Sequence, residues 1–248
     1  MFPMSAAALL CSYLVPTTRT IRHSPVVASE APHAEELIAA ARHYINEGTG
    51  YYSPLDASLM AEDYVFRGPS IGPLNKRDYI SVMQYFMMHE AFEDFSPNAF
   101  GFTVDPMDPL RVWFFVRASG TYTAKLGGAA GDLAALVTPP ASRTRYQGMP
   151  EAWSLLFDAE KRVRGQTAGY VADRFEAGST AAGRGLSFGV LATLGLELPF
   201  QPGDVRLQAI QRASKLLEPT GLVPVAVSRA EEVPAWWTST VSTVQGAD

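Results

Sequence analysis

The feature that most constrains the fold is a set of four extended segments between residues 100 and 173. They cover residues 100–105, 111–123, 151–158 and 162–173, and each is rich in aromatic and β-branched residues. Such residues favour pleated strands, and turn-forming residues separate the segments. The link over residues 158–161 suits a tight hairpin between the last two segments. The second part of the chain is therefore expected to form a sheet.

Three helices are expected ahead of these strands. Residues 34–46 place apolar side chains at helical spacing, namely Leu37, Ile38, Ala41, Tyr44 and Ile45. A short second helix is expected from Ser53 to Met60, because Pro54 suits the first helical position. Asn75 is expected to cap the third helix, whose apolar face carries Tyr79, Met83, Phe86 and Met87. A brief strand over residues 64–66 separates the second and third helices.

Residues 1–29 are expected to form a removable targeting leader. They contain no Asp or Glu, and an apolar run over residues 6–15 precedes a stretch rich in hydroxyl groups and Arg. This order resembles the bipartite leaders of algae with complex plastids. A plastid is therefore the predicted location, with the secretory pathway or the cytoplasm as alternatives, and a disordered N-terminus is the plainer interpretation.

Charge and cysteine content restrict the partners of the chain. The formal net charge is −5, whereas a protein that binds duplex nucleic acid needs a basic surface. No apolar run reaches the 18 residues that a membrane-spanning helix requires. The single cysteine, Cys11, lies in the expected leader. No metal or cofactor is predicted, because the four histidines are not spaced as ligands and nucleotide-binding motifs are absent.

Residues 176–248 are expected to be an extension that packs on a domain formed by residues 30–175. The extension is Gly-rich over residues 177–189, apolar over 190–200 and helical in pattern over 205–217. A separate domain of this size would be difficult to stabilise alone. A Gly-, Ala- and Pro-rich insertion over residues 127–148 is expected to be a loop near the strand ends.

Several motifs resemble the NTF2-like superfamily, and its SnoaL-like members in particular. Residues 59–69 resemble the passage from the second helix into the first strand, and residues 72–79 resemble the opening of the third helix. Residues 154–163, followed by 165–170, are similar to the final hairpin of SnoaL-like proteins. Residues 170–174 and the Gly-rich stretch after them are similar to uncharacterised SnoaL-like proteins of algae.

The resemblance implies an α+β cone. Three N-terminal helices would pack on a strongly curved mixed or antiparallel sheet that encloses an apolar pocket, with the C-terminal extension outside it. The superfamily includes polyketide cyclases, ketosteroid isomerases, dehydratases, transport factors and association domains without catalysis, so the fold alone fixes no function. Its members often pair through the open sheet face, which predicts a homodimer.

The resemblance also implies a carboxylate in the cone as the proton-transfer group. Asp173, at the end of the last strand, is the first candidate, because burial can raise the pKa of such a group into a useful range. Arg117 and Tyr122 are the candidate electrostatic partners. The plainer alternatives are a surface Asp173 paired with Arg174, and an exposed Arg117 at a strand end.

Other side chains are expected to line the pocket: Tyr64, Tyr79, Met83, Phe86, Trp113, Phe115, Trp153 and Tyr170. Alternation along the strand of residues 111–123 places Arg117 on the same face as Trp113 and Phe115. For each of these side chains, a place in the ordinary core is the plainer interpretation.

The leading hypothesis is a SnoaL-like protein that binds a small apolar molecule carrying a carbonyl. It would isomerise or cyclise this molecule by proton transfer, without a cofactor. The alternative is a non-catalytic interaction or assembly module in a plastid, with the C-terminal extension covering the cone. An open cavity beside Asp173 and Arg117 would favour the enzyme, whereas a plugged pocket mouth would favour the module.

Overall fold

The structure is a computed structural model that describes residues 31–134, 142–171, 178–181, 183–196, 199, 204–220 and 225–238. The expected leader, part of the 127–148 insertion and Asp173 lie outside the described residues. Within the described ranges, no helix combines the length and the apolar character needed to cross a membrane.

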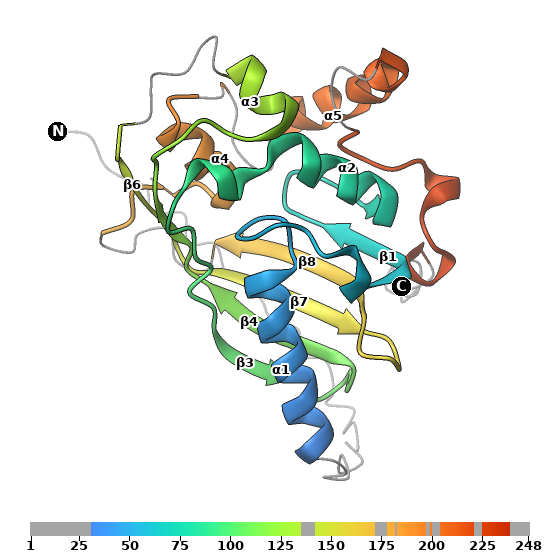
Figure 1. The fold of residues 1–248 in the computed structure, drawn as a ribbon. Coiled ribbons are helices and arrows are strands. Elements are labelled where there is room, and N and C mark those ends of the chain that lie inside the picture. The colour runs from blue at the N-terminus through green and yellow to red at the C-terminus, as the bar shows by residue number, and fades with distance from the viewer. Residues whose placement is uncertain are drawn as a thin grey trace, which may run out of the picture.

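A curved six-stranded mixed sheet forms the centre of the fold (Figure 1). Its strand order is β2-β1-β8-β7-β4-β3, with β1 and β8 parallel and the other neighbours antiparallel. The strands are β1 (Met60–Arg67), β2 (Leu74–Asn75), β3 (Phe100–Val104), β4 (Arg111–Val116), β7 (Glu151–Phe157) and β8 (Val163–Val171). A separate antiparallel ribbon pairs β5 (Ser119–Thr121) with β6 (Arg145–Gln147). The expected α+β class and mixed sheet are therefore present.

The helices and turns are α1 (Ala31–Glu47), η1 (Ala57–Leu59), α2 (Lys76–Phe86), η2 (Met88–Ala91), α3 (Gly128–Ala134), α4 (Leu186–Thr193), α5 (Val205–Leu217), η3 (Glu218–Thr220) and η4 (Ala230–Glu232). The arrangement of three helices ahead of the sheet is not confirmed. The expected second helix is only the turn η1, because the Asp56 side chain caps it by accepting from the Ser58 N–H and Met60 already belongs to β1. β1 and β2 then precede α2.

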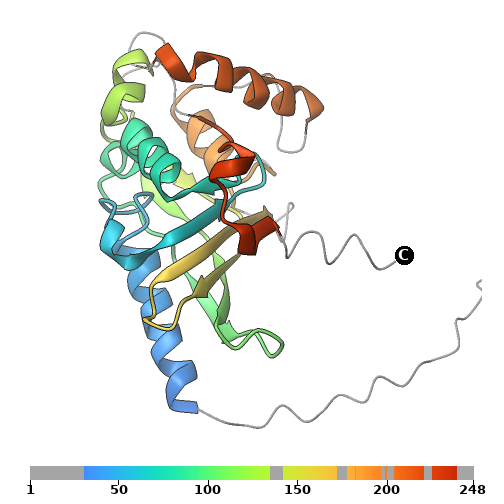
Figure 2. The ribbon, with the colours of Figure 1, turned by 90° about the vertical axis from the view of Figure 1, so that its right-hand side faces the viewer.

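The helices α1 and α2 pack on one face of the sheet, here called the inner face (Figures 1 and 2). Along β4, Val112, Phe114 and Val116 are buried on this face. Trp113 and Phe115 point to the outer face, where they are 40% and 38% exposed. The hydrophobic core thus lies between the inner face and the helices.

Residues 225–238 return to the first part of the chain. The Ser228 hydroxyl donates to the buried Asp78 carboxylate at 2.6 Å, and it accepts from the backbone N–H of Asn75 at 2.9 Å. On the outer face, the Trp236 indole donates to the carbonyl oxygen of Asp63 at 3.0 Å. These bonds attach the last described segment to both α2 and β1.

Candidate binding site at Glu151

Arg117 and Tyr122, the predicted electrostatic partners of the proton-transfer site, lie beside different aromatic residues. The Arg117 guanidinium lies 5.4 Å from the ring centre of Phe100, whose side chain is 41% exposed. Tyr122 is buried, with its ring centre 6.1 Å from that of Phe92. Asp173 lies outside the described residues, so its role stays a prediction.

Of the predicted pocket residues whose side chains the structure describes, Trp153 lines a small cavity. Trp113 and Phe115 do not, because the helices cover the other face of β4. Tyr64, Tyr79, Met83 and Phe86 belong to the core between α2 and the sheet. There the Tyr64 hydroxyl donates to Gln166 Oε1 at 2.8 Å, and the Tyr79 hydroxyl donates to the Thr49 carbonyl oxygen at 2.7 Å. The side chain of Tyr170 lies outside the described part.

The cavity has a volume of about 40 Å³ and lies where β7 begins, next to the first turn of α4. Strands β7 and β8, the loop after β1 and the start of α4 form its walls. They contribute Tyr51, Phe66, Gly68, Pro69, Ser70, Ile71, Glu151, Trp153, Ala168, Gly185, Leu186, Ser187 and Phe188. Most of these side chains are apolar, so each polar group among them is a candidate for ligand recognition.

Glu151 is the acidic residue of this cavity and is only 5% exposed. Its Oε1 accepts from the backbone N–H of Leu186 at 2.5 Å, and its Oε2 accepts from the indole Nε1 of Trp153 at 3.1 Å. Burial raises the pKa of Glu151 to about 7, although both hydrogen bonds lower it. A carboxyl group with such a pKa is populated in both protonation states near neutral pH, as general acid–base chemistry requires.

The strand pattern explains how Glu151 reaches the cavity. Successive side chains of a strand point to opposite faces, so Glu151 shares the inner face with Trp153, Leu155 and Phe157, all of which are buried. An acid in line with three large apolar residues is an unusual strand pattern. That pattern is the signal that could have identified Glu151 from the sequence, where only Trp153 was singled out.

Three buried tyrosines have pKa values that the charge of Glu151 affects. Burial raises the pKa values of Tyr51, Tyr52 and Tyr146, and the negative charge of Glu151 raises them further. The ring of Tyr51 meets that of Trp153 edge to face, with centres 5.9 Å apart. The three phenols therefore stay protonated near neutral pH, and the surroundings of Glu151 carry hydroxyl groups that can donate hydrogen bonds.

Two hydroxyl groups near this region have no partner in the described part of the chain. They are the buried Oγ of Ser70, which lines the cavity, and the buried hydroxyl of Tyr52. A buried polar group without a hydrogen bond typically costs about 1–3 kcal/mol. Ser70 is therefore a candidate to bind a polar group of a ligand in the cavity.

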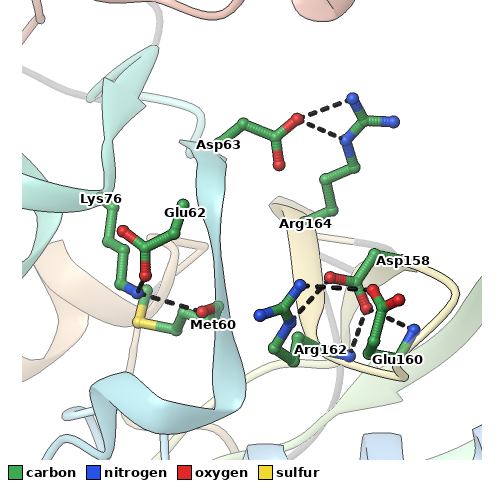
Figure 3. Close-up of polar contacts among 8 residues, drawn as sticks. All are labelled: Met60, Glu62, Asp63, Lys76, Asp158, Glu160, Arg162 and Arg164. Carbon is green, nitrogen blue, oxygen red and sulfur yellow. Dashed lines mark hydrogen bonds and ion pairs between the residues drawn. The ribbon is translucent and has the colours of Figure 1, made fainter.

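A second, open groove of about 530 Å³ lies on the surface beside α2. It is lined by Glu62, Asn75, Lys76, Arg77, Ile80 and Glu232. Lys76 pairs with Glu62 at 2.7 Å, and Arg77 pairs with Glu232 at 3.0 Å. Figure 3 shows the Lys76 pair beside two further ion pairs of the same region, Arg164 with Asp63 at 2.6 Å and Arg162 with Asp158 at 2.8 Å. Such exposed pairs contribute little free energy and leave the groove without excess charge, so Glu151 is the stronger candidate.

Comparison with known proteins yields structural neighbours only. No protein-family model matches the chain, and no curated protein matches it. A crystal structure described as a SnoaL-like polyketide cyclase from Jannaschia sp. CCS1 aligns with 56% of this chain and 87% of its own, at 11% identity and a TM-score of 0.35. BvnE pinacolase from Penicillium brevicompactum aligns with 56% of this chain and 84% of its own, at 15% identity and a TM-score of 0.39.

A third neighbour is a protein from Catenulispora acidiphila with a ketosteroid isomerase-like fold, solved in complex with trimethylamine. The alignment covers 68% of this chain and 99% of that one, at 12% identity and a TM-score of 0.39. Identities and TM-scores at this level assign no activity to the chain, so its function is argued from its own side chains. The chain is thus similar in structure to a protein described as a SnoaL-like polyketide cyclase and to one described as having a ketosteroid isomerase-like fold.

Proposed function

We propose that this protein binds a small apolar molecule carrying a carbonyl group in the cavity at Glu151, and that Glu151 transfers a proton next to that carbonyl. The observation that carries the proposal is the burial of this single carboxyl group in an apolar cavity, which raises its pKa to about 7. A carboxyl group in water would be almost fully ionised at neutral pH and a weaker base. In this proposal Glu151 takes the role that is predicted for Asp173 from the family resemblance.

The proposed reaction is an isomerisation by two proton transfers. The Glu151 carboxylate removes a proton from the carbon next to the carbonyl, and the electron pair of the broken C–H bond forms the enolate. The protonated Glu151 then returns the proton to another carbon of the conjugated system. The enolate oxygen needs a hydrogen-bond donor, and the Ser70 hydroxyl is the candidate within the cavity.

Two measurements test the proposal on the full-length chain. A thermal-shift screen with polyketide-like, steroid, carotenoid and fatty-acid ligands identifies the class that binds, because a ligand specific to the native state raises the melting temperature. For each ligand that binds and has a carbonyl, ¹H NMR in D₂O follows exchange of the protons next to it. We expect catalysed exchange in the wild type and none in Glu151→Gln. Equal exchange in both proteins would exclude Glu151 as the base.

The alternative is a non-catalytic interaction module, and one observation favours it. The first turn of α4 lines the cavity, and the Leu186 N–H already binds the Glu151 carboxylate. Under this alternative Glu151 is a structural residue that attaches the C-terminal extension to the sheet. No thermal shift with any ligand class, together with capture of a protein partner by the full chain, would support the module.

A further inference from the structure

The first turn of α4 contacts Glu151 directly. The Leu186 N–H is the first of this helix and donates to Glu151 Oε1 at 2.5 Å. Leu186, Phe188 and Val190 are buried, so the helix is held by apolar packing as well as by this bond. Its residues from Leu186 to Phe188 also form one wall of the cavity. The same helix therefore forms a wall of the cavity and donates a hydrogen bond to its carboxylate.

Two glycines permit this close approach. A Cβ atom at Gly185 would lie 2.9 Å from Glu151 Oε1, and a Cβ atom at Gly189 would lie 3.0 Å from a ring carbon of Tyr146. Both distances are shorter than ordinary van der Waals contact. The packing of α4 against Glu151 and Tyr146 therefore depends on the absence of side chains at these two positions.

A ligand of several carbon atoms requires more room than the cavity provides. The cavity measures about 40 Å³, whereas pockets for drug-sized ligands are on the order of 300–1,000 Å³. Strands β7 and β8 are fixed by hydrogen bonds to strands on both sides. The helix α4 is not paired into the sheet, so it is the wall that we expect to move.

Movement of α4 would leave one acceptor of a buried carboxylate without a donor. Trp153 would still satisfy Oε2, but Oε1 would lose the Leu186 N–H. An unpaired buried charge is strongly unfavourable, so a ligand that takes the place of α4 and excludes water must itself donate a hydrogen bond to Oε1 of the ionised carboxylate. A hydroxyl or enol group on an apolar body meets this requirement.

We propose that the Leu186 N–H occupies the position of a ligand's O–H donor, so that α4 and a hydroxylated or enolised apolar carbonyl compound compete for Glu151 Oε1. The helix closes the site when no such compound is bound. This inference rests on the proposed function of the cavity and extends it, because it names the group that the site recognises and the element that controls access.

The test compares Leu186→Pro with Leu186→Ala in the full chain. Both substitutions truncate the side chain, but only proline removes the N–H. Proline is well tolerated at the first helical position, and Gly185 has an extended ψ of 173° that suits a residue before proline. The probes are phenol and anisole, which have the same ring, although only phenol donates a hydrogen bond. Binding is followed by ¹H NMR titration.

We expect phenol to bind Leu186→Pro about ten-fold more tightly than Leu186→Ala, as one hydrogen bond to a charged group implies. Anisole should not distinguish the two variants in this way. Gly185→Ala is a second route to the same state, because its new Cβ would lie 2.9 Å from Glu151 Oε1, so that the carboxylate and the start of α4 must separate while Leu186 stays intact. It therefore decides the question if the proline variant does not fold.

The outcomes separate this inference from the proposed function. Equal phenol affinity in Leu186→Pro, Leu186→Ala and Gly185→Ala would overturn the competition while leaving the cavity as a binding site. The same gain for anisole as for phenol would also overturn it, because access alone would then explain the result. No phenol binding to any of these proteins would overturn both this inference and the proposed function.

Discussion

Replacing Glu151 with glutamine should remove a specific pH dependence from the stability of this protein. The carboxyl group has a pKa of about 4.5 in an unfolded chain, and burial raises it to about 7 in the folded protein. Between these values the folded state holds a proton that the unfolded state has lost, so the free energy of unfolding falls as the pH rises. The difference of about 2.5 pH units, at about 1.4 kcal/mol per unit, corresponds to roughly 3 kcal/mol.

Urea denaturation of the wild type and Glu151→Gln at half-unit steps from pH 4.5 to 8.5 measures this effect. The quantity of interest is the difference in the free energy of unfolding between the two proteins, because the contributions of the other titrating groups cancel in it. Relative to the wild type, the variant should gain roughly 3 kcal/mol between pH 4.5 and 7, with a plateau above that range. If the difference in the free energy of unfolding between the two proteins does not change with pH, the conclusion that burial keeps the Glu151 carboxyl group protonated is wrong.

Three further predictions follow from other contacts. Trp153→Phe removes one of the two hydrogen bonds that lower the pKa of Glu151, so this pKa should rise and the loss of stability should extend to higher pH in the same urea titration. Ser228→Ala removes the hydroxyl that donates to buried Asp78 and should lower the free energy of unfolding by about 1–3 kcal/mol, measured by urea denaturation at pH 7. The homodimer stays a prediction; if the exposed outer face around Trp113 forms it, light scattering should find a dimer for the wild type and a monomer for Trp113→Glu, and a monomeric wild type would contradict it.

Strand alternation predicted which side chains share a face, but not which face is covered. The prediction that Trp113 and Phe115 point the same way is correct, as their similar exposure shows. Their assignment to a pocket depended on where the helices lie, and α1 covers the side of β4 that carries Phe114 instead. The position of a helix over a sheet follows from contacts between distant segments, which a local pattern does not encode.

The same reason explains why Glu151 was missed. Its place on a strand was predicted, and an acid among inward-facing apolar residues was visible in the sequence. Its raised pKa depends on burial by a helix that begins 35 positions later. The helix expected over residues 53–60 failed for a more local reason. The side chain of Asp56 caps a single turn, and the strand pattern begins at once with Met60.

The parallel pairing of β1 with β8 has a consequence for synthesis of the chain on the ribosome. β1 emerges about a hundred residues before β8, and its other neighbour, β2, has only two residues. The outer side of β1 is completed later still, when Trp236 binds Asp63 from 173 positions away. Until β8 pairs with it, β1 has an unpaired edge of the kind that promotes aggregation. Nascent chains should therefore depend on chaperones until β8, which ends at Val171, has emerged.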